Sequence, residues 1–197
     1  MVQTRPHVIG IGGTTRPGST TERVLQFALR VAEDGGATTA GFFGPELADL
    51  PMYTTERQSR TPTARRLADQ LRHADGIILA SPGYHGSVSG LVKNALDYVE
   101  DLRDDDRAYF DGLAVGCIAT GAGWQAIVST LQQLRTIAHA LRGWPTPLGA
   151  AINTTERVFG DDGTVVDERA RFQLETVARN VMQFADYKIA ATQHADA

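Results

Sequence analysis

The sequence contains very little cysteine and lysine, and both shortages exclude whole classes of site. Cys117 is its one cysteine, so the chain can form neither an internal disulfide nor a thiolate cluster for zinc or iron–sulfur. The five histidines are scattered without metal-ligand spacing. Lys93 and Lys188 are the only lysines, which nearly excludes motifs that depend on lysine. We therefore expect no metal site, and we expect Cys117 to be a buried, unreactive thiol.

The sequence also has a small net charge and lacks a long hydrophobic run. The sequence has 19 basic and 23 acidic residues, a net charge of −4, and it lacks the clustered basic face that nucleic-acid binding requires. It has no apolar run of about 20 residues, the length of a membrane span. Its first six residues do not resemble a signal peptide. Because 42% of its residues are hydrophobic, a packed core is possible. We expect a cytoplasmic globular protein that binds neither nucleic acid nor a membrane.

Short apolar runs alternate with helical patterns along the whole sequence. Five segments repeat apolar residues at helical spacing, and five apolar runs have the length of strands. The run at residues 76–81 is apolar without alternation, which is typical of a strand covered on both faces. The expected strands are residues 8–13, 38–43, 76–81, 113–120 and 147–152, and the expected helices are residues 20–34, 63–73, 88–100, 127–141 and 170–184.

This alternation predicts an α/β fold: a five-stranded parallel sheet with helices on both faces. We find no repeat, low-complexity tract or linker, so we expect one domain over residues 1–197 with a core at about residues 7–185. We expect frayed ends at residues 1–6 and 189–197. The acidic run at residues 100–106 is interpreted as a solvated loop.

The loop after the first expected strand has the composition of a phosphate site. It leads into a helix N-terminus, where free amides and the helix dipole favour an anion. Hydroxyl groups and one guanidinium, all able to donate to phosphate oxygens, are concentrated in eight positions. The residues are Thr14, Arg16, Ser19, Thr20 and Thr21.

Two nucleotide motifs and a purely structural role compete with this interpretation. Gly13 and Gly18 have the separation of a P-loop, but Ser19 stands where the lysine must be. A dinucleotide fingerprint lacks its third glycine, because Thr15 occupies that position. Ser19 and Glu22 also form a capping box, which by itself explains a serine and a glutamate at a helix start. Capping does not explain the arginine or the other hydroxyls.

A second informative stretch follows the third expected strand. Residues 82–87 read PGYHGS and residues 93–97 read KNALD. Together with GTTRPGS at residues 13–19, these motifs resemble the NAD(P)H-dependent FMN reductase family of flavodoxin-like proteins, over about residues 7–185. The resemblance implies a flavodoxin-like sheet with strand order 2-1-3-4-5. In such a sheet the crevice beside the first and third strands binds flavin.

The resemblance also implies the cofactor-binding residues. Thr14, Arg16, Ser19 and Thr21 match the loop that holds the FMN phosphate, with Thr20 adding an amide. The turn that lines the isoalloxazine ring corresponds to Pro82, Gly83, Tyr84, His85 and Gly86. The small-residue loop at the other edge of the ring corresponds to Thr120, Gly121 and Gly123. Relatives often have glutamate at the position of Gly83 and asparagine at those of His85 and Thr21.

Three of the residues near these motifs have alternative roles. Tyr84 could be an ordinary core aromatic, and His85 could be a surface residue rather than a catalytic one. Trp124 could border the flavin or a neighbouring subunit, or simply pack. The counterparts of Asn94 and Asp97 in the family lie near a subunit contact, so the resemblance implies a homodimer or homotetramer.

The implied function is hydride transfer from NADPH or NADH to FMN, and from FMN to a second acceptor. The chemistry belongs to the cofactor, so no catalytic residue is expected from the protein. The acceptor could be free flavin for a monooxygenase, a quinone, an azo compound or a metal ion. Two alternatives are an electron-carrier flavodoxin, which the mild net charge disfavours, and a flavin-free regulatory domain.

Overall fold

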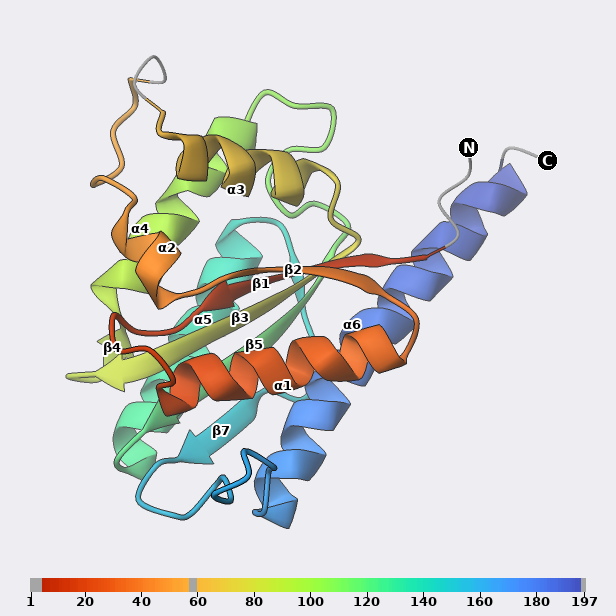
Figure 1. Ribbon diagram of the computed structural model, residues 1–197. Helices are drawn as coiled ribbons and strands as arrows, with labels where there is room; N and C mark the ends of the chain where they lie inside the picture. Colours follow the sequence, from red (N-terminus) through yellow and green to blue (C-terminus); the bar gives the residue numbers. More distant parts are fainter. Residues whose placement is uncertain (1–4, 57–59, 196–197) are drawn as a thin grey trace.

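The computed structural model describes residues 5–56 and 60–195, and its centre is a mainly parallel sheet (Figure 1). The strands are β1 (His7–Gly12), β2 (Thr38–Phe42), β3 (Gly76–Tyr84), β4 (Ser87–Val88), β5 (Ala114–Gly121), β6 (Trp144–Pro145) and β7 (Ala150–Asn153). The helices are α1 (Thr20–Asp34), α2 (Gly44–Ala48), α3 (Pro62–Arg72), α4 (Gly90–Asp97), α5 (Trp124–Ala140) and α6 (Glu168–Ala195), with a 3₁₀ helix at Tyr98–Leu102. None of the described helices is both long and apolar enough to cross a bilayer.

The sheet has seven strands, so the expected five-stranded sheet is only partly confirmed. Its main path is β2-β1-β3-β5-β6, with β7 also parallel to β5 and β4 antiparallel to the end of β3. The expected fifth strand, residues 147–152, corresponds to β7, and β6 is a further short strand before it; β6 and β7 pair with opposite ends of β5. Pro147 lies between β6 and β7, and proline lacks the amide that a continuous ladder needs. The expected strand order therefore holds only for the parallel segments.

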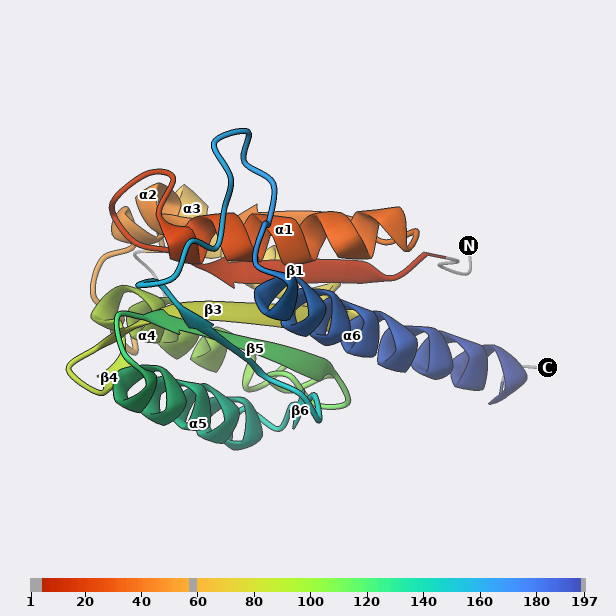
Figure 2. The ribbon, with the colours of Figure 1, turned by 90° about the horizontal axis from the view of Figure 1, so that it is seen from below.

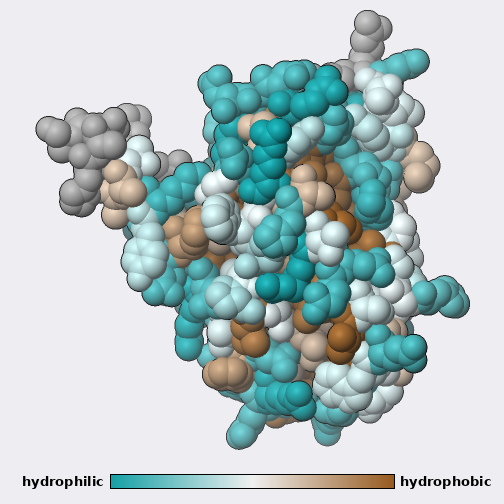
Figure 3. Space-filling model, turned by 180° about the vertical axis from the view of Figure 1, so that it is seen from behind, coloured by the Kyte–Doolittle hydropathy of each residue, from teal (hydrophilic) through white to brown (hydrophobic). Residues whose placement is uncertain are grey.

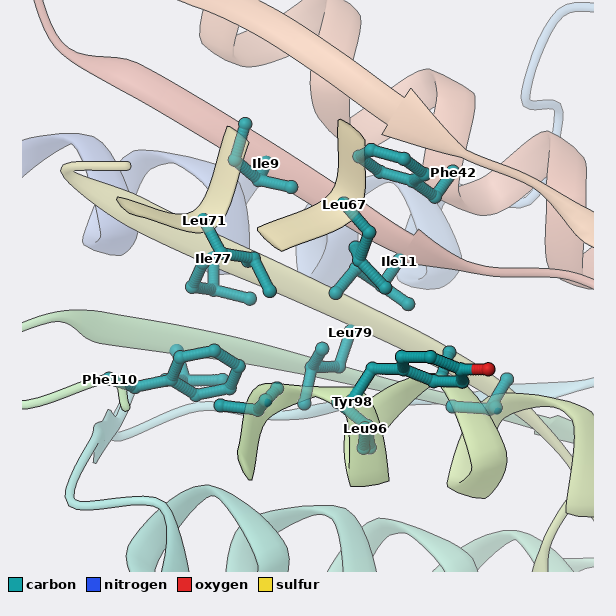
Figure 4. Packing of buried hydrophobic residues seen from close by; sticks show 14 of the residues in the cluster. Ile9, Ile11, Phe42, Leu67, Leu71, Ile77, Leu79, Leu96, Tyr98 and Phe110 are labelled. Atoms are coloured by element: carbon teal, nitrogen blue, oxygen red, sulfur yellow. The ribbon is translucent and has the colours of Figure 1, made fainter. Parts of the chain in front are cut away.

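The two faces of the sheet are covered by different helices, as the view in Figure 2 shows. Helices α1 and α6 cover one face, where their apolar side chains pack against Val8, Ile78 and Ile118. Helices α3, α4 and α5 cover the other face, where Ile9 and Ile77 point. Figure 4 shows this second cluster between the sheet and α3 and the 3₁₀ helix. Alternate residues of each strand thus enter opposite cores, which requires a strand that is apolar throughout.

The bounds of α1 are those expected from the sequence, whereas the bounds of the other helices differ from the expected ones. Helix α1 has the expected bounds, and Ser19 is its N-cap. Helix α2 was not expected in the proline-containing loop. Helix α4 starts at Gly90 rather than at residue 88 because Ser87 and Val88 pair with β3. Helix α6 continues to Ala195, so the expectation of frayed residues is wrong for 189–195, while residues 1–4 and 196–197 lie outside the described part.

The acidic run at residues 100–106 is only partly a solvated loop. Asp101 is 8% exposed and accepts hydrogen bonds from Arg60 at 2.6 and 2.8 Å. Arg60 also lies over the rings of Tyr53 and Tyr98. The pair therefore fastens the segment before α3 to the 3₁₀ helix. Asp105 pairs with Arg72 of α3 at 2.8 Å. The sequence interpretation was wrong for Asp101 and Asp105 because it could not show the cations that these carboxylates face.

Candidate functional site

Two adjoining hollows lie at the carboxyl end of the parallel strands. The first, here called the cleft, has a volume of about 300 Å³. The cleft is lined by Thr14, Arg16, Ser19, Thr20, Thr21, Pro82, Gly83, Tyr84, Thr120, Gly121, Ala122 and Thr154. The second, here called the outer hollow, has a volume of about 690 Å³ and is lined by His85, Gly86, Gly123, Trp124, Gln125, Ala126 and Ser129. Every residue expected at the site therefore lines one of the two hollows.

Thr154 is a cleft residue that sequence reasoning missed. Its amide donates to Gly121 C=O at 2.8 Å, directly after β7. The signal for it was available, because ligands of open α/β sheets bind outside the carboxyl ends of the strands. Any polar residue that follows a parallel strand was therefore a candidate.

The start of α1 presents hydrogen-bond donors to the cleft. Ser19 caps the helix, since its Oγ accepts from Glu22 N at 3.3 Å. Accepting this bond leaves the hydroxyl proton of Ser19 available to a ligand. The amides of Thr20 and Thr21 belong to the first helical turn and have no intrahelical acceptor. Capping and anion binding are thus compatible at this serine.

The expected capping box is only half formed. The Glu22 carboxylate accepts from Gly18 N at 3.2 Å instead of from Ser19 N, which donates to Arg16 C=O at 3.3 Å. Gln26 Nε2 holds the same carboxylate at 3.1 Å. A negative charge therefore stands beside the loop.

Arg16 and Thr14 occupy the loop in different ways. The Arg16 side chain is exposed and has no hydrogen-bond or ion-pair partner among the residues that the structure describes. Thr14 Oγ1 accepts from Arg16 N and donates to Arg16 C=O, both at 3.2 Å. Its hydroxyl thus stabilises the loop, and the guanidinium is the group that is free to bind an anion.

Thr21 and Thr120 join the first helix to the end of β5 beneath the cleft. Their hydroxyl oxygens lie 2.6 Å apart, and both residues are buried. One hydroxyl proton is used between them and the other stays available. Thr21 was expected to donate a hydrogen bond independently. The structure shows instead that Thr21 and Thr120 together have one hydroxyl proton left to donate to a ligand.

The ends of β3 and β4 form a tight hairpin at the boundary between the two hollows. Tyr84 pairs with Ser87, and the two residues between them, His85 and Gly86, have φ values of 52° and 82°. Positive φ at both central positions is the geometry of a type I′ turn. Tyr84 is 53% exposed, so the interpretation as a core aromatic is wrong. His85 is also exposed.

The side chains of Gln133 and Ser81 hold this hairpin in place by hydrogen bonds. Gln133 of α5 donates from Nε2 to Gly86 C=O at 2.7 Å and accepts from Ser87 Oγ at 2.6 Å. Ser81 Oγ accepts from Ser89 N at 2.9 Å. The hairpin is therefore fixed at its tip and at its base before any ligand binds.

Gly83 has no room for a side chain. A Cβ atom there would lie 2.8 Å from Thr130 Oγ1 and 3.0 Å from Ala126 C=O. Helix α5 thus packs directly on the backbone of the hairpin. This contact explains physically why glycine stands where relatives often have glutamate, and it leaves the cleft lined by backbone at this point.

Comparison with known proteins shows the family to which the chain belongs. A profile of the family described as NADPH-dependent FMN reductase matches residues 6–156. The chain belongs to this family. An FMN-dependent NADPH-azoreductase from Staphylococcus saprophyticus is 33% identical over 173 residues, which cover 83% of this chain and 86% of that protein. The chain is thus an NAD(P)H-dependent FMN oxidoreductase that uses FMN and NADPH.

Solved structures agree on the flavodoxin-like fold of this FMN reductase. FerB, a flavoenzyme NAD(P)H:acceptor oxidoreductase from Paracoccus denitrificans, superposes with a TM-score of 0.75 at 21% identity, covering 92% of this chain and 98% of that one. The apo form of an NADH:FMN oxidoreductase superposes with a TM-score of 0.69 at 21% identity, covering 91% and 88%. At this identity the likeness concerns the fold.

The cysteine of this reductase takes no part in the site. Cys117 lies in the middle of β5 and is fully buried. Burial raises the pKa of the Cys117 thiol to about 12. Because the thiolate is the reactive form, the thiol is inert near neutral pH.

Proposed function

We propose that the cleft and the adjoining hairpin hold FMN within a single domain that spans the chain. The FMN phosphate is assigned to Thr14, Arg16, Ser19, Thr20 and Thr21. The isoalloxazine ring is assigned to the hairpin residues Pro82, Gly83, Tyr84, His85 and Gly86 and to the loop residues Thr120, Gly121 and Gly123. The observation that carries this proposal is that the loop before α1 and the hairpin after β3 line one cleft.

The donor set suits a phosphate monoester at one end and a flat ring at the other. Unpaired first-turn amides, the Ser19 hydroxyl and the Arg16 guanidinium are donors without a competing acceptor of their own. At the hairpin, Gly83 lines the cleft, and Gly86 carries no side chain, so its backbone is accessible to a planar ligand. A preorganised hairpin can hold such a ring without reordering the chain.

The protein binds and orients, whereas bound FMN supplies the redox chemistry by accepting a hydride and passing electrons to a second acceptor. We assign no catalytic residue to the protein, because the redox chemistry belongs to the cofactor. His85 is exposed on the hairpin and is assigned to ring contact only.

For the second acceptor we propose a small planar molecule that can reach the open side of the cleft. Similarity to an FMN-dependent NADPH-azoreductase supports an azo compound, while free FMN for a partner monooxygenase and a quinone are alternatives. The test is anaerobic single-turnover oxidation of the NADPH-reduced enzyme by an azo dye, a quinone and free FMN. The acceptor with the largest second-order rate constant identifies the class, and equal slow rates with all three would contradict the proposal.

An electron carrier without its own NADPH oxidation is the less supported alternative. The family profile is that of a reductase, and the net charge of −4 is mild for a carrier that recognises its partner through charge. Steady-state NADPH oxidation by the purified protein with added FMN distinguishes the two. No oxidation above the flavin-only rate would favour the carrier.

We also propose a cytoplasmic homodimer or homotetramer. Figure 3 shows the molecule from behind the view of Figure 1, where apolar patches lie between polar side chains. Asn94 does not contribute to such a contact, because its buried amide bonds to Leu50 C=O, Pro51 C=O and Tyr53 N within its own chain. Asp97 is partly exposed and pairs with Lys93 at 2.5 Å. Sedimentation analysis tests the oligomeric state.

A further inference from the structure

The outer hollow continues the cleft around the hairpin and the loop after β5. Tyr84 and Ala122 line the cleft, and the next residue along the chain from each, His85 and Gly123, lines the outer hollow. A ligand in the outer hollow would therefore lie beside one in the cleft. With about 690 Å³, the outer hollow has the size of a site for a nucleotide-sized molecule.

Trp124 presents a large aromatic surface at this place. It is the first residue of α5 and is 42% exposed, although a tryptophan would gain more by burial. It shares the wall of the outer hollow with the exposed Gln125. An exposed indole beside a hollow is a stacking surface for a planar base.

Arg169 brings a positive charge to the same ring. Its Cζ lies 5.2 Å from the centroid of the Trp124 ring. Within the described part of the chain, no carboxylate lies at ion-pair distance from Arg169. Other exposed arginines of this region do have such partners, as Arg157 with Asp161 and Arg179 with Glu175 show. The guanidinium therefore keeps its hydrogen-bond donors for a ligand.

We propose that Trp124 and Arg169 bind the adenosine 2′-phosphate end of NADPH and that Arg169 selects NADPH over NADH. This inference rests on the proposed placement of FMN in the cleft. The indole provides the stacking surface for adenine, and the guanidinium donates to the 2′-phosphate, which NADH lacks. Arginine suits this role because its planar fork matches phosphate oxygens and stacks on aromatic rings.

The test compares kcat/KM for NADPH and for NADH in the wild type and in variants. Arg169→Ala should lower kcat/KM for NADPH about tenfold, the effect of one charge-assisted hydrogen bond, and leave that for NADH within about twofold. Trp124→Leu should raise KM for both nucleotides, because both carry adenine. Arg179→Ala, which removes an exposed arginine from another turn of α6, should change neither value. FMN content is measured in each preparation.

Direct binding gives a readout that does not depend on turnover. In titration calorimetry of the FMN-loaded protein, 2′,5′-ADP should bind more tightly than 5′-ADP, and Arg169→Ala should abolish the difference. An unchanged NADPH preference in Arg169→Ala, or an equal loss for both nucleotides, overturns the inference. Failure of the proposed function looks different, since the wild type would then neither retain FMN nor oxidise either nucleotide.

Discussion

Gln133 Nε2 donates to the carbonyl oxygen of Gly86 at 2.7 Å, and this bond connects the middle of α5 to the tip of the β3–β4 hairpin. The amide oxygen of the same side chain accepts from Ser87 Oγ at 2.6 Å. One glutamine thus satisfies two polar groups of the hairpin that we assign to the flavin ring. Its role is to position the turn rather than to react.

Replacing Gln133 should weaken FMN binding more than it weakens the fold. Gln133→Leu keeps the volume but removes both bonds, so the hairpin loses order and the FMN Kd should rise about fivefold to tenfold, the effect of about 1 kcal/mol. Gln133→Glu keeps an acceptor for Ser87 but no donor for Gly86, and should resemble Gln133→Leu. Gln132→Leu, at an exposed neighbouring position, is the control. Flavin fluorescence titration measures Kd. Equal values for all four proteins would show that the hydrogen bonds of Gln133 to the hairpin do not affect FMN binding.

The buried ion pair of Arg60 and Asp101 should contribute strongly to stability. Both side chains are 9% exposed, so Asp101→Ala leaves a guanidinium buried against Tyr53 and Tyr98 without its counter-charge. Breaking such a pair lowers the free energy of unfolding by about 3 kcal/mol. Urea unfolding measures this change. Arg103→Ala, which removes an arginine that is 58% exposed in its surface ion pairs, should leave the free energy of unfolding almost unchanged.

Thr130 has a buried hydroxyl without a hydrogen-bond partner in the described structure. Thr130→Val replaces this unsatisfied group by a methyl of the same shape, so stability should stay equal or rise by about 1 kcal/mol. Thr146 is the matched control, since its buried hydroxyl donates to Leu148 C=O at 2.8 Å. Thr146→Val should therefore lower stability by about 1 kcal/mol. If both substitutions destabilise equally in thermal unfolding, Thr130 has a partner after all.

Cys117 should make stability depend on pH at the alkaline end. Burial raises the pKa of its thiol to about 12, above the value of about 8.5 in an unfolded chain. As pH rises, the thiol therefore loses its proton in the unfolded chain before it does so in the folded chain. The free energy of unfolding falls between about pH 8.5 and 12 as a result. The stability difference between the wild type and Cys117→Ala should narrow over this range. Iodoacetamide should alkylate native protein slowly at pH 8 and denatured protein quickly, and rapid native alkylation would contradict the burial.

Much of the fold was predictable because local rules decide it. The bounds of α1 follow from the Ser19 cap and the apolar spacing, and the apolar stretch of β3 follows from its burial on both faces. The short strand β6 before the last expected strand was missed, since it depends on which part of β5 has a free edge. The ion pair of Asp101 was missed for the same kind of reason, because its partner lies 41 residues away.

The composition of the site was predictable, but its internal connections were not. Motif spacing identified both the loop at residues 13–21 and the hairpin, and the structure brings them to one edge. The bond between Thr21 and Thr120 spans 99 positions, and the roles of Gln133 and Thr130 depend on how α5 packs on the hairpin. Side chains of this kind have no local pattern that predicts them.

Two substitutions separate phosphate binding from helix capping at α1. Ser19→Asp keeps a good N-cap but places a carboxylate where the phosphate is assigned, so the protein should fold and bind FMN poorly. Arg16→Ala removes the free guanidinium without touching the cap. Arg30→Ala, at an exposed position of the same helix, should leave FMN binding unchanged.

The most direct test of the account compares the Kd of the apoprotein for FMN with its Kd for riboflavin, which has the same ring and no phosphate. If the loop before α1 binds the phosphate, FMN should bind about a hundredfold tighter than riboflavin or more. The ratio of the two Kd values should fall towards one in Ser19→Asp and in Arg16→Ala. Equal affinity for the two flavins, or a ratio that neither substitution changes, would contradict the central claim.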